Sequence, residues 1–166
     1  MKDREINILI LCTGNSARSI LAESLINKLG KGRVHGFSAG SSPAGKVNPF
    51  AIELLADKGL PVAGLRSKSW DEFAKPGAEK IDFVITVCDN AAGEVCPIWP
   101  GHPVVAHWGI PDPAGVEGSD EQKAEAFSLA YDRLEKRLTA FFSLSFEELD
   151  TDLLKSKMNA IGQMDD

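Results

Sequence analysis

The sequence predicts a three-layer α/β/α domain built on a four-stranded parallel sheet. Strand-like runs alternate with segments of helical periodicity along the chain, which is typical of parallel sheets covered by helices. The first of these runs, residues 5–12 (EINILILC), has almost no polar break, as expected for a strand buried on both faces. The chain has 166 residues and no recognisable repeat or linker, so we expect one domain whose strands are joined by right-handed crossovers.

Two strand–helix units account for the first half of the chain. After the first strand, apolar residues recur at helical spacing over 20–29, and Gly30 ends the pattern. Residues 33–38 (RVHGFS) suit a second strand. A turn-rich loop then leads to a helix expected at 50–59, and residues 66–74 indicate a short polar helix or turn.

The second half predicts two further strands and two further helices. Residues 81–87 (IDFVITV) are rich in β-branched side chains, and residues 103–107 (PVVAH) suit a fourth strand. Prolines break residues 108–118 into a loop. Amphipathic patterns predict helices at 121–142 and 146–161.

Composition limits the class of protein. We assign residues 1–149 to the α/β domain and residues 150–166 to a helical tail of the same domain.

No apolar run is long enough to span a membrane, and the charged residues 1–5 lack the apolar stretch of a secretory signal, so we expect a cytoplasmic protein. With 24 acidic against 18 basic side chains, the net charge of −6 argues against nucleic acid as a partner.

Chemistry is expected in the loop after the first strand, because ligands bind outside the carboxyl ends of parallel strands. Cys12 stands at that end, and small or polar residues separate it from Arg18. Their backbone N–H groups can converge on an anion, beside the positive end of the next helix. The Arg18 guanidinium suits a tetrahedral oxyanion. The expected oxyanion-binding residues are Thr13, Gly14, Asn15, Ser16, Ala17 and Arg18.

The same loop can activate a nucleophile. A positive field stabilises a thiolate, so we expect a lowered pKa for Cys12, and the Ser19 hydroxyl could donate a hydrogen bond to its sulfur. Asp112, in a proline-rich loop after the fourth strand, could protonate a leaving oxygen. The alternatives are a buried cysteine at a strand end, a solvated Arg18 and an ordinary Asp-Pro turn.

Two more cysteines follow the third predicted strand. Cys88 ends that strand and Cys96 lies in the next loop, so parallel pairing would bring these thiols to the sheet edge that holds Cys12. Three converging thiols suggest a disulfide relay. A pair of inert buried cysteines, or a zinc site with His102 and His107, are the alternatives.

Residues 40–46 (GSSPAGK) fit the G-x4-G-K pattern of nucleotide-binding loops. However, Val47 stands where the pattern requires a hydroxyl to bind Mg²⁺. We therefore expect a loop here, with no nucleotide bound.

Four motifs resemble the low-molecular-weight protein tyrosine phosphatase superfamily and, more closely, its arsenate reductase branch. The resemblance runs from about residue 5 to 149, and its motifs are CTGNSARS (12–19), FSAG (37–40), VITVCDNAAGEVCP (84–97) and HWGIPDPA (107–114). It implies that arsenate binds in the first motif and that the Cys12 thiolate attacks arsenic while Asp112 protonates the departing oxygen. Cys88 would then attack Cys12 and release arsenite, and Cys96 would attack Cys88.

The resemblance also implies partners. Thioredoxin, or a low-molecular-weight thiol such as glutathione with glutaredoxin, would restore the thiols, and no tightly bound cofactor is expected. The Cys88–Cys96 loop is one residue longer than in thioredoxin-coupled members, and Ala17 stands where many relatives carry cysteine. Some members hold an alkali cation, and the matching positions are Asn15, Glu23, Ser38 and Asp71.

Two other functions fit the same loop. A low-molecular-weight phosphatase would hydrolyse phosphomonoesters through a Cys12 phosphoenzyme and would not need Cys88 or Cys96. An oxyanion-binding or redox-sensing module would bind without turnover.

Overall fold

The computed structural model describes residues 5–75, 77–87, 103–144 and 150–163. These residues form a four-stranded parallel sheet in the order β2-β1-β3-β4. The strands are β1 (Ile6–Cys12), β2 (Val34–Gly40), β3 (Phe83–Thr86) and β4 (Val104–His107). The predicted four-stranded parallel sheet is thus confirmed.

Strand β1 lies in the middle of the sheet and separates two cores. Its side chains alternate between the faces, as the strand period of two requires. Ile8 and Ile10 join the larger core, whereas Leu9 and Leu11 join the smaller one. All four side chains are buried, which explains why the sequence of this strand is almost continuously apolar.

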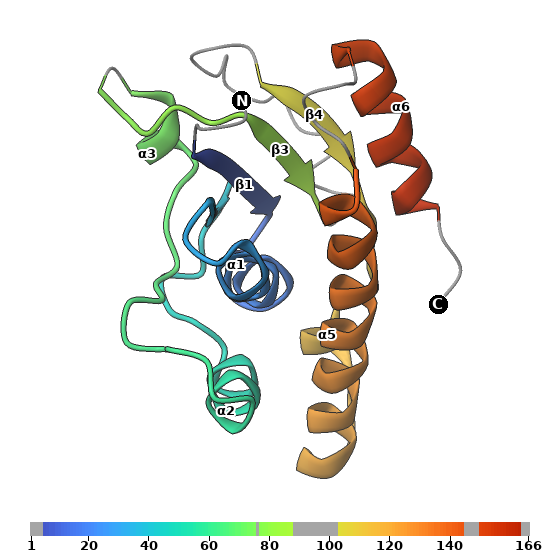
Figure 1. Cartoon of the computed structure of the whole chain (residues 1–166). Coiled ribbons are helices and arrows are strands. Elements are labelled where there is room, and N and C mark those ends of the chain that lie inside the picture. Colours follow the sequence, from blue (N-terminus) through green and yellow to red (C-terminus); the bar gives the residue numbers. More distant parts are fainter. Residues whose placement is uncertain (1–4, 76, 88–102, 145–149, 164–166) are drawn as a thin grey trace.

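Helices flank the sheet (Figure 1). On the larger core, α1 (Arg18–Gly30) packs beside α5 (Asp120–Phe142), and α2 (Pro49–Asp57) contacts α5. On the smaller core, the short α3 (Asp71–Ala74) buries Phe73 against the sheet. Helix α6 (Thr151–Gly162) lies beside β4 and joins the larger core through Leu154, Met158 and Ile161.

Capping residues explain where two of the helices, α2 and α6, begin. Helix α2 begins at Pro49, one residue earlier than expected, because the Asn48 side chain accepts a hydrogen bond from the N–H of Phe50. Helix α6 begins after Asp150, whose carboxylate accepts from the N–H of Leu153. The expected start of this helix at residue 146 lies outside the described residues.

One short element was not predicted. Residues Pro113–Gly115 form a single 3-10 turn, η1, inside the segment that we expected to be a loop. The Asp112 carboxylate caps this turn by accepting from the N–H of Ala114, at 2.9 Å. Within the described residues, we find no helix that is both long enough and apolar enough to cross a membrane.

Candidate active site

A small pocket of about 170 Å³ lies where β1 ends and α1 begins. Residues 12–18, which we call the oxyanion loop, line most of it, and Asp112 and Ala114 close one side. The structure therefore brings Asp112, which is far from the oxyanion loop in the sequence, to the same cavity as Cys12 and Arg18. Cys12 is 6% exposed, so its thiol lies at the base of the pocket rather than on the surface.

The segment that follows β2 holds the backbone of the oxyanion loop. The carbonyls of Thr13, Gly14 and Ser16 accept hydrogen bonds of 2.9–3.0 Å from the backbone N–H groups of residues 42, 44 and 48. In a trans peptide the next N–H points opposite to the carbonyl. We infer that the N–H groups after these carbonyls point away from residues 42–48, toward the pocket, as an anion-binding loop requires.

The segment that supports the oxyanion loop, residues 41–48, overlaps the stretch that fits the pattern of a nucleotide-binding loop. These residues form a loop, as expected for the Gly40–Lys46 stretch, and their backbone N–H groups hold the oxyanion loop in place. Gly40 pairs with Cys12 across the sheet, and a Cβ atom at Gly40 would lie 2.4 Å from the carbonyl oxygen of Thr13. The close approach of the two backbones therefore requires glycine here.

Asn15 fixes the centre of the oxyanion loop. Its backbone adopts the left-handed conformation (φ 46°) and its side chain is fully buried. The amide Nδ2 donates to the hydroxyls of Ser19 and Ser38, each at 2.9 Å, and Oδ1 accepts from the N–H of Lys68 at 2.9 Å. The sequence pointed to Asn15 for anion binding, whereas the structure gives its side chain a supporting role behind the loop.

Arg18 is held beside the pocket. Its Nη1 donates to the carbonyl of Ile110 at 2.8 Å, and its Nη2 lies 3.6 Å from the carboxylate of Asp112. The side chain of Arg18 is 13% exposed and that of Asp112 is 48% exposed, so the carboxylate lies at the solvent side. The Nε atom of Arg18 is buried with no hydrogen-bond partner among the described residues. An oxyanion in the pocket would give this N–H donor an acceptor.

A buried ion pair between Glu23 of α1 and Lys68 lies behind the oxyanion loop. The carboxylate of Glu23 accepts a hydrogen bond from Ser38, and the ammonium of Lys68 lies 3.8 Å from it. Burial raises the pKa of Glu23 and lowers that of Lys68, while each charge opposes the shift of the other. Sequence reasoning missed Lys68 because a lysine in a polar stretch reads as a solvated side chain.

The candidate alkali-cation residues are only partly gathered. Asn15, Glu23 and Ser38 form one hydrogen-bonded cluster, but Asp71 is exposed at the start of α3. The oxygen of Asn15 is already used by the N–H of Lys68, and the ammonium of Lys68 faces Glu23. The donor set present therefore does not fit an alkali cation.

Of the remaining site residues, the structure describes Ser19 and His107 and does not describe the other three. Ser19 is buried and its oxygen accepts from Asn15, which leaves its own proton to donate. His107 contacts the hydroxyl of Thr86 at 2.7 Å through Nδ1. Cys88, Cys96 and His102 lie outside the described residues. Where the chain is described, no three His, Cys, Asp or Glu side chains gather as a metal site.

Arsenate reductases are among the proteins similar to this chain. One from Halalkalibacterium halodurans is 37% identical over 134 residues, which are 81% of this chain and 93% of that protein. A crystal structure of an arsenate reductase from Archaeoglobus fulgidus has a TM-score of 0.59 and 29% identity, over 80% of this chain and 98% of that one. A thioredoxin-dependent arsenate reductase from Corynebacterium glutamicum, at 24% identity, shares the fold with a TM-score of 0.57, over 84% of this chain and 63% of that one.

The match extends to a whole family. A sequence model described as low molecular weight phosphotyrosine protein phosphatase matches residues 7–156, which include the oxyanion loop, the sheet and α5. The resemblance inferred from the four sequence motifs is thus confirmed, and the chain belongs to the low molecular weight phosphotyrosine protein phosphatase family.

Proposed function

We propose that this protein is an arsenate reductase that uses Cys12 as its nucleophile. The observation that carries the proposal is the single pocket in which Cys12, Arg18 and Asp112 meet. Its volume of about 170 Å³ suits a small tetrahedral anion. The similarity to arsenate reductases selects arsenate among such anions.

The first step forms a bond between sulfur and arsenic. Arsenate binds to the N–H groups of the oxyanion loop and to the guanidinium of Arg18. The Cys12 thiolate, stabilised by the hydroxyl of Ser19, attacks arsenic, and an As–O bond breaks. The group that departs is a hydroxyl of arsenate, and Asp112 gives it a proton so that it leaves as water. Arsenic is still pentavalent in the thiol-bound intermediate.

The second step transfers electrons to arsenic. The Cys88 thiolate attacks the sulfur of Cys12, so that an S–S bond forms and the As–S bond breaks. The electron pair of that bond stays on arsenic, which leaves as arsenite. In support, Val87, which directly precedes Cys88, donates a hydrogen bond of 3.0 Å to the carbonyl of Leu11, next to Cys12.

The third step regenerates the nucleophile. Cys96 attacks Cys88, which frees the Cys12 thiol and leaves a Cys88–Cys96 disulfide. We propose thioredoxin as the reductant of this disulfide, because the similar Corynebacterium protein is thioredoxin-dependent. Glutathione with glutaredoxin is the competing reductant, and a reducing cytoplasm would supply either.

Serine substitutions test the relay. Cys12→Ser, Cys88→Ser and Cys96→Ser should each abolish arsenate turnover with thioredoxin, thioredoxin reductase and NADPH. After arsenate treatment without reductant, mass spectrometry should find the loss of two hydrogens mapped to Cys88–Cys96. Normal turnover by Cys88→Ser would exclude the relay, and a lasting glutathione adduct would favour the glutaredoxin route.

The family match supports a second candidate, the hydrolysis of phosphomonoesters. Here Cys12 would form a phosphoenzyme and Asp112 would protonate the leaving alcohol, without any role for the other two cysteines. The two functions separate in one variant: Cys88→Ser should keep any hydrolysis of p-nitrophenyl phosphate and lose arsenate reduction. Efficient hydrolysis together with no arsenate reduction in the unsubstituted protein would favour the phosphatase.

A further inference from the structure

The side chain of Lys68 is a buried cation behind the oxyanion loop. It is 8% exposed, and its ammonium donates to the carbonyl of Arg66 at 2.9 Å and faces the carboxylate of Glu23 at 3.8 Å. Removing an ammonium from water is costly unless a charge partner and hydrogen bonds compensate, so this placement has to be explained.

The backbone of Lys68 is built into the same support. Its N–H donates to Asn15 at 2.9 Å and its carbonyl accepts from the N–H of Gly40 at 2.9 Å. One residue thus connects the carboxylate of α1, the end of β2 and the centre of the oxyanion loop.

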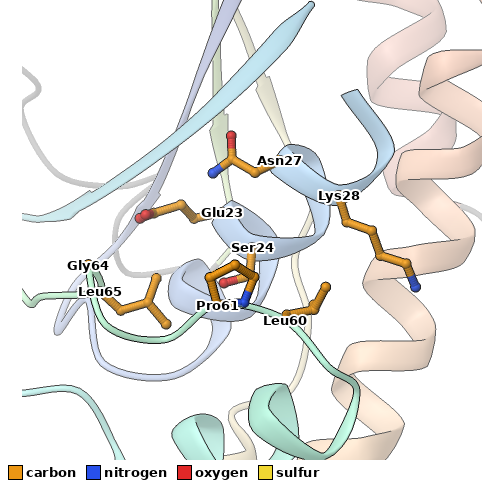
Figure 2. Close-up of a pocket in the computed structure, with 8 residues that line it drawn as sticks. All are labelled: Glu23, Ser24, Asn27, Lys28, Leu60, Pro61, Gly64 and Leu65. Carbon is orange, nitrogen blue, oxygen red and sulfur yellow. The ribbon is translucent and has the colours of Figure 1, made fainter. Parts of the chain in front are cut away.

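Within the described residues, the other cations near Glu23 have partners of their own. Arg66 makes a two-point ion pair with Glu72, at 2.6 and 3.0 Å. Lys28 leaves α1 in the direction opposite to Glu23 and lies 4.0 Å from Glu135 (Figure 2). The ammonium of Lys68 therefore supplies most of the charge that balances Glu23, with a smaller contribution from Arg66.

A path leads from this pair to the pocket. Glu23 accepts from the hydroxyl of Ser38, whose oxygen accepts from Asn15, and Asn15 holds the left-handed turn of the oxyanion loop. If the charge facing Glu23 were lost, a buried carboxylate would be left uncompensated next to the two groups that shape this loop.

We propose that the ammonium of Lys68 is a tethered cation that takes the role of a free alkali ion and makes the oxyanion loop independent of K⁺ and Na⁺. Any consequence for arsenate turnover rests on the proposed function, but the expected effects on anion binding and stability do not. The cluster of Asn15, Glu23 and Ser38 does not fit an alkali ion because the covalently attached ammonium of Lys68 has replaced the exchangeable ion.

The surroundings of Glu23 allow the proposal to be tested. Glu23 lines a cavity of about 340 Å³ between α1 and the segment 60–65, together with Ser24 and Asn27 (Figure 2). If the ammonium is removed, a hydrated ion can reach the carboxylate through this cavity. The neutral variant Lys68→Gln should therefore acquire a cation requirement that the natural chain lacks.

The experiment measures the affinity for inorganic phosphate by calorimetry and the melting temperature, in KCl, NaCl and tetramethylammonium chloride at equal ionic strength. The unsubstituted protein should give the same values in all three salts. Lys68→Gln should bind phosphate about tenfold more weakly in tetramethylammonium chloride, within the usual range of coupling between two sites, and should recover in KCl. Lys28→Gln, a lysine of the same cavity wall, is the matched control and should show no salt preference.

Each outcome decides the question. A K⁺-specific rise in phosphate affinity or melting temperature in the unsubstituted protein would overturn the proposal, as would a Lys68→Gln variant indifferent to the salt. If Lys68→Gln does not fold, Lys68→Arg, which keeps the charge, should fold and remain indifferent to K⁺, and a K⁺ requirement in that variant would overturn the proposal. Absence of phosphate binding in every salt would count against the proposed function, and the melting temperatures would still judge Lys68.

Discussion

The substitution Asn15→Ala removes the centre of the support beneath the oxyanion loop. Three buried groups lose a hydrogen-bond partner: the hydroxyls of Ser19 and Ser38, and the backbone N–H of Lys68. The new alanine must also adopt a left-handed backbone, since φ is 46° at this position.

The magnitude follows from these losses. A buried N–H left without an acceptor costs about 1–3 kcal/mol, and each hydroxyl that loses a donor costs roughly 0.5–1.5 kcal/mol. The left-handed conformation adds about 1 kcal/mol for a residue with a Cβ atom. We expect Asn15→Ala to lower the free energy of unfolding by roughly 3–7 kcal/mol, against a total of about 5–15 kcal/mol for a domain of this size.

Urea unfolding followed by far-ultraviolet circular dichroism measures this loss. Asn15→Gly is the matched variant, because it loses the same hydrogen bonds but tolerates the left-handed backbone, and it should be about 1 kcal/mol more stable than Asn15→Ala. A loss below about 1 kcal/mol for Asn15→Ala would refute the supporting role of Asn15. Equal stability of the two variants would refute the conformational part of the argument.

Three further perturbations are expected to act at separate places. Gly40→Ala puts a Cβ atom 2.4 Å from a carbonyl of the oxyanion loop, so phosphate affinity measured by calorimetry should fall at least ~10-fold, whereas Gly64→Ala, which meets nothing within 4 Å, should leave it unchanged. Met158→Ala empties a fully buried position of α6 and should cost about 2–5 kcal/mol in urea unfolding. The hydrogen bonds from Arg66 lower the pKa of Glu72, so this pair stabilises the fold above the ordinary carboxyl range and stops doing so as the pH falls through the lowered pKa. The stability difference between the natural chain and Glu72→Gln, roughly 0.2–1 kcal/mol near neutral pH for an exposed pair, should therefore vanish in acid.

The two central strands of the sheet were predictable from the sequence because they are buried on both faces. Residues 5–12 and 81–87 carry continuous apolar or β-branched runs, and the observed strands β1 and β3 lie within them. The pattern from residue 20 to Gly30 likewise gave the helix α1, and its end. In each case the signal is local, because the apolar pattern of a few consecutive residues is enough to predict the element.

The support of the oxyanion loop was not predictable in this way. The contact of Lys68 with Glu23 joins residues 45 positions apart, and nothing in the polar stretch around Lys68 distinguishes a buried ammonium from a solvated one. The bracing by residues 42–48 depends on backbone groups, which carry no sequence signature. Such features follow from tertiary contacts, so they become visible only when the chain is folded.

Helix α6 has a consequence beyond the stability that it adds. Strand β4 is one of the two outer strands of the sheet, and an uncovered outer strand presents backbone groups to which another chain can pair. The side chain of Asn159 accepts from the backbone N–H of His107, and the indole of Trp108 donates to the carbonyl of Met158 at 2.7 Å. A chain shortened before residue 150 would expose this margin and the indole together, so the loss would show first as self-association at high concentration.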